Sequence, residues 1–224
     1  MASRADVDIA AETGVETFEP TWEIAHLFPA QGTWSEEEYP AWNTNRLMEF
    51  SHGHVEVLPM PAQSHQLIVL GLYRALQAFV EARRLGMVLV APLRVRLWPG
   101  KYCEPDVVFM SAEHDSRRHE QFWEAPDLVM EVVSEENRYL DLGVKRREYA
   151  QAGIPEYWIV DPTQVRITIL RLEGTRYTVH GEFEGGTQAT SALLEGFAVD
   201  VMAVLNSQGP VGVNQVKRLW SSGA

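Results

Sequence analysis

One glutamate inside an apolar strand sets the strongest constraint on this chain. Glu131 lies in the run of residues 126–134, where most of its neighbours are valine, leucine and methionine. A charge in such a strand is costly unless it is paired or holds a metal. A helical segment that carries Lys145 follows directly, so a carboxylate and an ammonium can meet at one sheet edge. These two groups are the minimum equipment for metal-assisted hydrolysis of a phosphodiester.

Composition indicates one globular domain with polar tails. Hydrophobic residues make up 46% of the 224 residues, which is enough to bury a sizeable core. We predict a disordered acidic tail over residues 1–20, one domain over 21–206 and a second tail over 207–224. No apolar run approaches the ~18 residues of a membrane span, and the first residues lack the apolar core of a secretion signal. We therefore expect a cytoplasmic protein without membrane contact.

The net charge of the chain is strongly acidic, at −12. A broad nucleic-acid surface neutralises phosphates with lysine and arginine, so this balance counts against one. It does not exclude a nuclease, because a metal site supplies its own positive charge. Basic residues gather locally at positions 138, 145, 146 and 147, where they could meet a phosphate or form a solvated helix face. The one cysteine, Cys103, excludes a disulfide within a single chain and a multi-cysteine zinc site.

Hydrophobic periodicity predicts an α/β (α+β) core. Residues 64–85 have the spacing of an amphipathic helix, with Ser64 as the expected N-cap and Gly86 after its end. A second helix is expected from a cap at Asp141 to Ala152. Strands are expected at residues 47–58 (with a hairpin turn at Gly53), 87–90, 93–97, 106–110, 128–133, 156–160, 165–172 and 176–182. This order favours a mixed sheet with helices on its faces.

Two aspartates compete as the metal ligand beside Glu131, and both follow a proline. Asp127 is four residues before Glu131 on the same strand, which separates them by about 13 Å, too far to share one ion. Asp106 begins a different strand and could lie beside Glu131 in the sheet, so it is the preferred ligand. Either aspartate could instead be a turn residue after proline, and for Asp127 this interpretation is preferred.

Glu131 and Lys145 also have plainer explanations. They could form a buried ion pair, which adds little net stability because desolvation offsets the attraction. Lys145 could instead pair with Asp141 on the helix surface, a contact of about 0.2–0.5 kcal/mol. A buried pair in a cleft more often marks a functional site, and we prefer the functional interpretation.

His52, His54 and Glu56 place three potential metal ligands on one face of a predicted strand. The pattern is similar to the metal strand of cupins, but the cupin glutamate lies further from the histidines and no later histidine segment completes the set. Surface or cleft-lining histidines are therefore the preferred interpretation. His65, at the start of the long helix, could face the cleft or cap a turn.

Several blocks of the sequence resemble the Uma2 family, also called DUF820, whose expected activity is that of an endonuclease. The blocks are residues 104–109, 125–134, the group of Asp141, Lys145, Arg146, Glu148 and Tyr149, residues 152–162, and the flanking segments 35–39 and 59–66. They span most of the chain apart from the two tails. The family resembles the restriction-endonuclease-like PD-(D/E)xK fold, which implies a mixed central sheet flanked by helices.

By this resemblance, Asp106 and Glu131 would hold Mg²⁺ (or Mn²⁺), and a lysine would orient or activate the attacking water. In the usual form that lysine lies two residues after the glutamate. This chain has Val133 there, so the role falls to Lys145 on the next helix. The resemblance also implies a nucleic-acid substrate, with DNA expected, and a homodimer. Cleft-lining positions are expected for His65, Ser134, Asp141 and His54.

One segment departs from the family. Members often have Asp-Gly-Glu in the strand before the proline-rich turn, whereas this chain has His52-Gly53-His54. If that glutamate normally helps the metal site, metal preference or activity is altered here. The alternative function is a non-catalytic nucleic-acid-binding or protein-interaction module that retains the nuclease fold. A third candidate is a small-molecule metalloenzyme that uses His52 and His54.

Overall fold

The computed structural model describes residues 29–42, 47–134 and 140–206. Every named element lies in the unit that begins at Gln31. The two expected tails, 1–20 and 207–224, lie outside the described residues. Within the described ranges, none of the helices combines the length and apolar character that crossing a membrane requires.

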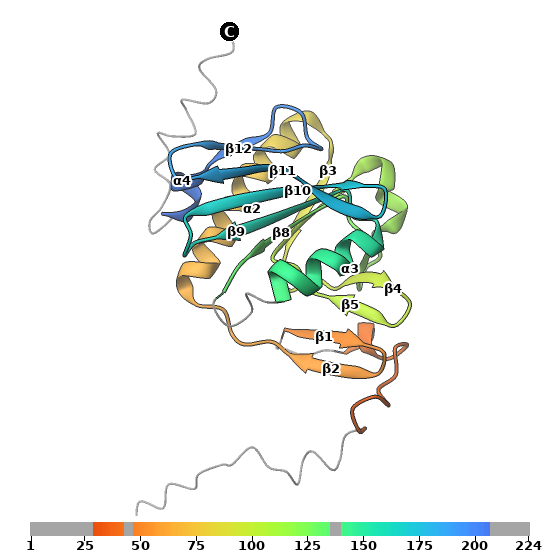
Figure 1. Ribbon diagram of the computed structural model, residues 1–224. Helices are drawn as coiled ribbons and strands as arrows, with labels where there is room; N and C mark the ends of the chain where they lie inside the picture. Colours follow the sequence, from red (N-terminus) through yellow and green to blue (C-terminus); the bar gives the residue numbers. More distant parts are fainter. Residues whose placement is uncertain (1–28, 43–46, 135–139, 207–224) are drawn as a thin grey trace, which may run out of the picture. The chain divides into compact units, whose positions relative to one another are not determined.

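A six-stranded sheet forms the centre of the fold (Figure 1). Its order across the sheet is β11 (Arg176–Glu184), β10 (Arg166–Glu173), β9 (Glu156–Asp161), β8 (Leu128–Val132), β6 (Val107–Ser111) and β3 (Gly86–Val90). The β8–β9 pair is parallel, and the other neighbouring pairs are antiparallel. The expected mixed sheet is therefore confirmed. Parallel strands need a crossover, and α3 (Lys145–Ala152) lies between β8 and β9 in the chain.

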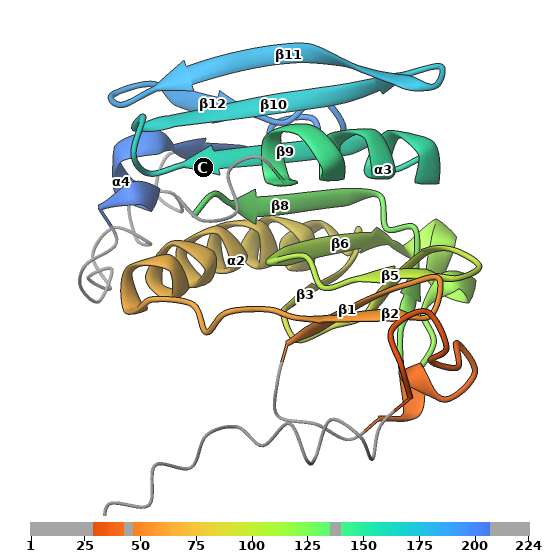
Figure 2. The ribbon, with the colours of Figure 1, turned by 60° about the horizontal axis from the view of Figure 1, so that its bottom comes forward.

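Alternation along β8 separates two cores. Leu128, Met130 and Val132 pack in the cluster that contains the buried residues of α2 (Gln63–Arg83). Val129 packs in the second cluster, together with Tyr149 of α3. The two helices therefore cover opposite faces of the sheet, and Figure 1 and Figure 2 show α2 and α3 on these two sides. Glu131 shares the face of Val129, as the period of a strand requires.

A second sheet carries a polar face. Its order is β2 (His54–Val57), β1 (Met48–Ser51), β5 (Lys101–Cys103), β4 (Val95–Trp98) and β7 (Trp123–Glu124). Phe50 and Tyr102 point into an aromatic cluster on one side. Glu49 and Lys101 alternate with them and belong to the other side, where Cys103 packs in the same cluster as Tyr149 of α3. The polar face of this sheet is thus turned toward α3.

The remaining elements are short. They are the 3₁₀ turns η1 (Tyr39–Ala41) and η2 (Ala112–Arg117), the π-helical turn η3 (Leu140–Val144), the strands β12 (Gln188–Thr190) and β13 (Ala198–Asp200), and the helix α4 (Val201–Leu205). β12, β13 and α4 contribute side chains to the core that α2 covers.

The caps expected at the two ends of α2 are wrong. The N-cap of α2 is Ala62 rather than Ser64. At its other end Arg84 takes the left-handed conformation, and the Leu85 amide closes the turn by bonding to Val80. Gly86 is therefore already the first residue of β3. The α3 helix runs from Lys145, directly after η3, to Ala152, where its end was expected. Asp141, the expected cap, lies within η3, and its side chain is outside the described residues.

The hairpin predicted at Gly53 is confirmed, but its histidines are not on one strand face. His52 (φ 47°) and Gly53 (φ 81°) form the tight turn between β1 and β2, and two positive φ values fit a type I′ turn. A side chain at position 53 would collide with the Gly32 carbonyl. Since only His54 and Glu56 lie on β2, the three-ligand strand face is wrong.

Candidate active site

Glu131 is buried on β8 and receives two donors from one helix. The Lys145 Nζ lies 3.0 Å from Glu131 Oε1, and the Tyr149 hydroxyl donates to the same oxygen at 2.5 Å. Lys145 and Tyr149 are one helical turn apart, so they lie on one face of α3. Burial raises the pKa of Tyr149 well above its ordinary value, and the Cys103 and Glu131 charges add to this rise. The phenol therefore stays protonated and can donate a hydrogen bond to the carboxylate.

Asp106 lies beside Glu131 on the neighbouring chain segment. Val107 at the start of β6 pairs with Met130, so one step further Asp106 comes opposite Glu131 and shares its face. The Val132 amide donates to Asp106 Oδ2 at 2.8 Å. The carboxylate thus holds the end of β8 in addition to facing the site.

His65 reaches Asp106 from the first turn of α2. Its Nε2 lies 3.2 Å from Asp106 Oδ2, and its buried Nδ1 has no hydrogen-bond partner among the described residues. Burial lowers the pKa of this imidazole. The hydrogen bond and charge of Asp106 and the charge of Glu131 outweigh that effect and raise the pKa above its ordinary value. His65 is therefore an electropositive neighbour of the carboxylate pair.

Asp127 lies at the other end of the same strand pair. Its Oδ2 accepts the Ser111 amide at 2.7 Å, and its Oδ1 lies 2.7 Å from His114 Nδ1. Asp127 thus holds the end of β6, just as Asp106 holds the end of β8. The structure brings Asp106, not Asp127, to the side of Glu131.

Three other residues were expected to line the cleft, namely Ser134, Asp141 and His54. Ser134 is half-buried shortly after β8, and residues 135–139, which follow it, lie outside the described residues. Asp141 belongs to η3, and its side chain is also outside the described part. His54 lines a small pocket beside the β1–β2 hairpin.

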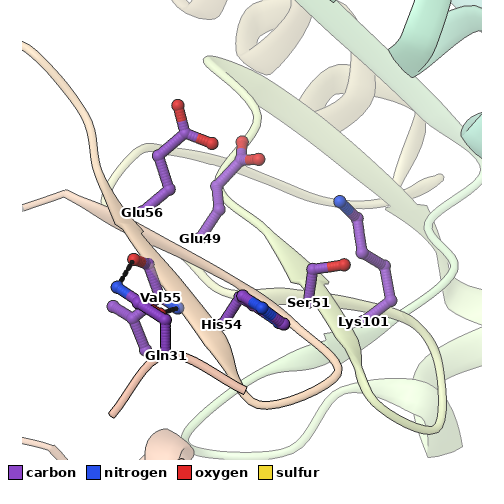
Figure 3. Close-up of a pocket in the computed structure, with 7 residues that line it drawn as sticks. All are labelled: Gln31, Glu49, Ser51, His54, Val55, Glu56 and Lys101. Atoms are coloured by element: carbon purple, nitrogen blue, oxygen red, sulfur yellow. Dashed lines mark hydrogen bonds between the residues drawn. The ribbon is translucent and has the colours of Figure 1, made fainter.

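Sequence reasoning missed the residues on the polar face of β1 and β5. Glu49, Glu56 and Lys101 line the same pocket of about 210 Å³ as His54 (Figure 3), and Lys101 Nζ lies 3.1 Å from Glu148 Oε1 on α3. Burial raises the pKa of Glu49, although the Lys145 and Lys101 ammoniums oppose this rise. The alternation of Met48 to Ser51 signals a two-faced strand, but not which element the polar face meets.

The donor chemistry of the site suits a hard divalent cation. Among the described residues, no group of three or more His, Cys, Asp or Glu side chains is gathered to hold a metal ion. Asp106 and Glu131 offer carboxylate oxygens, and Mg²⁺ commonly uses only one or two of these together with water and phosphate oxygens. The pair therefore fits Mg²⁺ or Mn²⁺, and it does not have the nitrogen and sulfur ligands of a structural zinc site.

Comparison with known proteins identifies the fold and the family of the chain. A crystal structure described as "a putative nuclease belonging to DUF820 from Anabaena variabilis ATCC 29413" has a similar fold, with a TM-score of 0.63 and 16% sequence identity over 80% of this chain and 99% of that one. At this identity the likeness establishes the fold. No curated protein matches the chain. The model of the Uma2 family, described as "Putative restriction endonuclease", matches residues 36–202. Because that match covers well over half of the sequence, the chain belongs to the Uma2 family.

Proposed function

We propose that this protein is a Mg²⁺-dependent endonuclease that hydrolyses phosphodiester bonds of DNA, with Asp106 and Glu131 as metal ligands and Lys145 as the catalytic cation. The observation that supports it most is the 3.0 Å contact between Lys145 Nζ and Glu131 Oε1 on a buried strand next to Asp106. The family and the fold support the same class of reaction.

Each residue has a distinct part in this proposal. Hydrolysis forms one P–O bond to the water oxygen, breaks one P–O bond to the sugar, and requires the water to lose a proton. Bound Mg²⁺ would polarise a phosphate oxygen and lower the pKa of its water. As an ammonium, Lys145 would stabilise the negative charge that develops on the phosphate. As a neutral amine, it would instead accept the proton that the attacking water loses. Tyr149 keeps the Glu131 carboxylate oriented.

Cleavage assays on duplex and single-stranded DNA, with Mg²⁺ and with Mn²⁺, test the proposal. Glu131→Gln and Lys145→Ala should each abolish cleavage while far-UV circular dichroism stays that of the folded protein. The double variant should be scarcely worse than either single one, because residues that act as a unit are far from additive. Glu173→Gln, at an exposed position of β10, is the matched control and should retain full activity.

Two results would contradict the assignment. Cleavage that survives both substitutions would indicate a contaminant or a different site. No cleavage by the unaltered protein, together with no divalent-cation binding, would favour a non-catalytic module that retains the fold. The net charge of −12 and the His52-Gly53-His54 segment support this second candidate.

We also propose a homodimer, since two copies would let two sites face the two strands of a duplex. Light scattering coupled to size-exclusion chromatography measures the mass directly, and a monomer at micromolar concentration would contradict it.

A further inference from the structure

Glu49 carries an oxygen that nothing in the described part of the chain satisfies. The residue lies on β1 and is half-buried, but its Oε1 is closed off from solvent and has no hydrogen-bond partner among the described residues. A buried carboxylate oxygen without a donor is destabilising, because it has lost its hydrogen bonds to water and gained none in return. Such atoms are rare in native proteins and call for an unseen partner such as an ion or a water.

The positive groups around Glu49 are already engaged with other carboxylates. Lys145 exerts the strongest attraction on Glu49, followed by Lys101. Yet Lys145 Nζ is 3.0 Å from Glu131, and Lys101 Nζ is 3.1 Å from Glu148. Like charges act on Glu49 from Glu148 and Glu56. Acidic groups therefore gather around Glu49, and a divalent cation would relieve their mutual repulsion.

The arrangement of the two sheets turns Glu49 toward Glu131. Glu49 follows Met48 and precedes Phe50, which face the aromatic cluster, so its side chain takes the opposite face. On that face the buried Cys103 thiol feels the charges of both Glu49 and Glu131. Glu49 and Glu131 thus lie on two sides of one small region, although they come from different sheets.

We propose that Glu49 is a third carboxylate ligand of the cation that Asp106 and Glu131 hold. This inference rests on the proposed function and deepens it. Carboxylate and water oxygens are the ligands that Mg²⁺ and Mn²⁺ accept. As they lie among the described residues, these three carboxylates are not gathered around one point. Because pairing with β2 and β5 fixes β1, the proposal requires Glu49 to reach the ion by rotation of its side chain. A bound cation then links the β1–β2 hairpin to β8.

The hairpin supplies its own matched control. Glu56 pairs directly with Glu49 across β1 and β2, and the two carboxylates point in the same direction in Figure 3. Glu56 is exposed, however, whereas Glu49 has the closed-off oxygen. The two glutamates are directly paired and lie on the same face of the sheet, and they differ in how far they are exposed to solvent. Glu49→Gln and Glu56→Gln therefore make a clean comparison.

The experiment measures Mn²⁺ binding to the full chain by isothermal titration calorimetry. Glu49→Gln should weaken Mn²⁺ affinity at least tenfold, Glu56→Gln should leave it within twofold, and Glu131→Gln should abolish it. Hydrogen exchange gives a second readout that does not depend on activity. Mn²⁺ should slow exchange of the hairpin amides 48–57 in the unaltered protein and have no such effect in Glu49→Gln. Without metal, Glu49→Gln should be at least as stable as the original, since it removes an unsatisfied buried charge.

The possible failures are distinguishable. If Glu131→Gln loses Mn²⁺ while Glu49→Gln binds like the original, Glu49 is not a ligand and the proposed function stands. An equal loss in Glu56→Gln would place the ion in the hairpin pocket and overturn the inference. If the unaltered protein binds no Mn²⁺, both this inference and the metal site of the proposed function are wrong.

Discussion

Replacing Glu156 by glutamine should destabilise the protein severely, although glutamine differs from glutamate only by an NH₂ group in place of one oxygen. Glu156 is fully buried at the start of β9. Its Oε1 accepts the Trp158 indole N–H at 2.6 Å and the Ser191 hydroxyl at 2.7 Å. Its Oε2 accepts the Ala192 and Leu193 amides, each at 2.6 Å. The carboxylate thereby fastens the segment that leads into β13 to the central sheet.

The size of this loss of stability follows from the number of hydrogen-bond donors that the Glu156 carboxylate accepts. A glutamine keeps one acceptor oxygen, so two of the four donors face an NH₂ group instead. The Ser191 hydroxyl can turn round and accept, but an indole or amide N–H cannot. One orphaned buried donor costs about 1–3 kcal/mol, and the surviving bonds weaken because their acceptor is no longer charged. Relief of carboxylate desolvation offsets part of this loss. Together these effects give an expected net loss of about 3–5 kcal/mol in the free energy of unfolding.

Urea unfolding followed by far-UV circular dichroism measures this loss. For a chain of this size, 1 kcal/mol corresponds to about 2–4 °C in Tm, so thermal melting should show a fall of about 6–20 °C. Hydrogen exchange should also show faster exchange of the Ala192 and Leu193 amides. Glu173→Gln on the exposed part of β10 should change stability by less than about 0.5 kcal/mol. A Glu156→Gln protein within 1 kcal/mol of the original would refute the reasoning.

The other predictions concern metal binding and pH. Asp127→Asn should leave Mn²⁺ affinity within twofold, because Asp127 holds Ser111 and His114 at the far end of the strand pair; calorimetry that shows a loss as complete as in Glu131→Gln would contradict this. Replacing both His52 and His54 by alanine should likewise preserve Mn²⁺ affinity, and a lost binding isotherm would revive the histidine-bound metal. Burial raises the pKa of Glu104 from its ordinary 4.5 to about 7, so the folded chain holds this proton more tightly than the unfolded chain. The contribution of Glu104 to stability should therefore be fully present below pH 4.5 and fall by about 1–3 kcal/mol as pH rises through 7; Glu104→Gln should remove that contribution in urea unfolding measured from pH 4.5 to 8.

Long periodic segments explain why much of the fold was predictable. The helix α2 and the hairpin of β10 and β11 have enough residues for a period of 3.6 or 2 to be visible in the sequence. The strands β5, β7 and β12 have two or three residues each, and so few residues contain no period. The predicted end of α2 was wrong for a local reason. Arg84 takes a left-handed conformation there, and an arginine in the sequence does not indicate such a conformation.

Some residues of the candidate site could be predicted from the sequence, and others could not. Glu131 could be found because a carboxylate interrupts an apolar strand, and Asp106 because an antiparallel neighbour can present a residue opposite it. Glu49 could not be found in this way. Its strand alternates plainly, but the partner of its polar face depends on how a second sheet packs, which is set by contacts distant in the sequence. His52 was misplaced because a two-residue turn removed it from the strand.

The paired roles of Asp106 and Asp127 affect how relatives of this protein should be read. Each aspartate accepts an amide at the end of the opposite strand, so each is useful to the fold whether or not any chemistry occurs. A relative without the proposed nuclease activity would still need Asp106 for this contact. A lysine and a glutamate buried together offer folding little, because apolar side chains of similar volume serve as well or better. Under the proposed function, the pair Glu131 and Lys145, rather than the Pro-Asp motif, is therefore the feature that would separate active relatives from inactive ones.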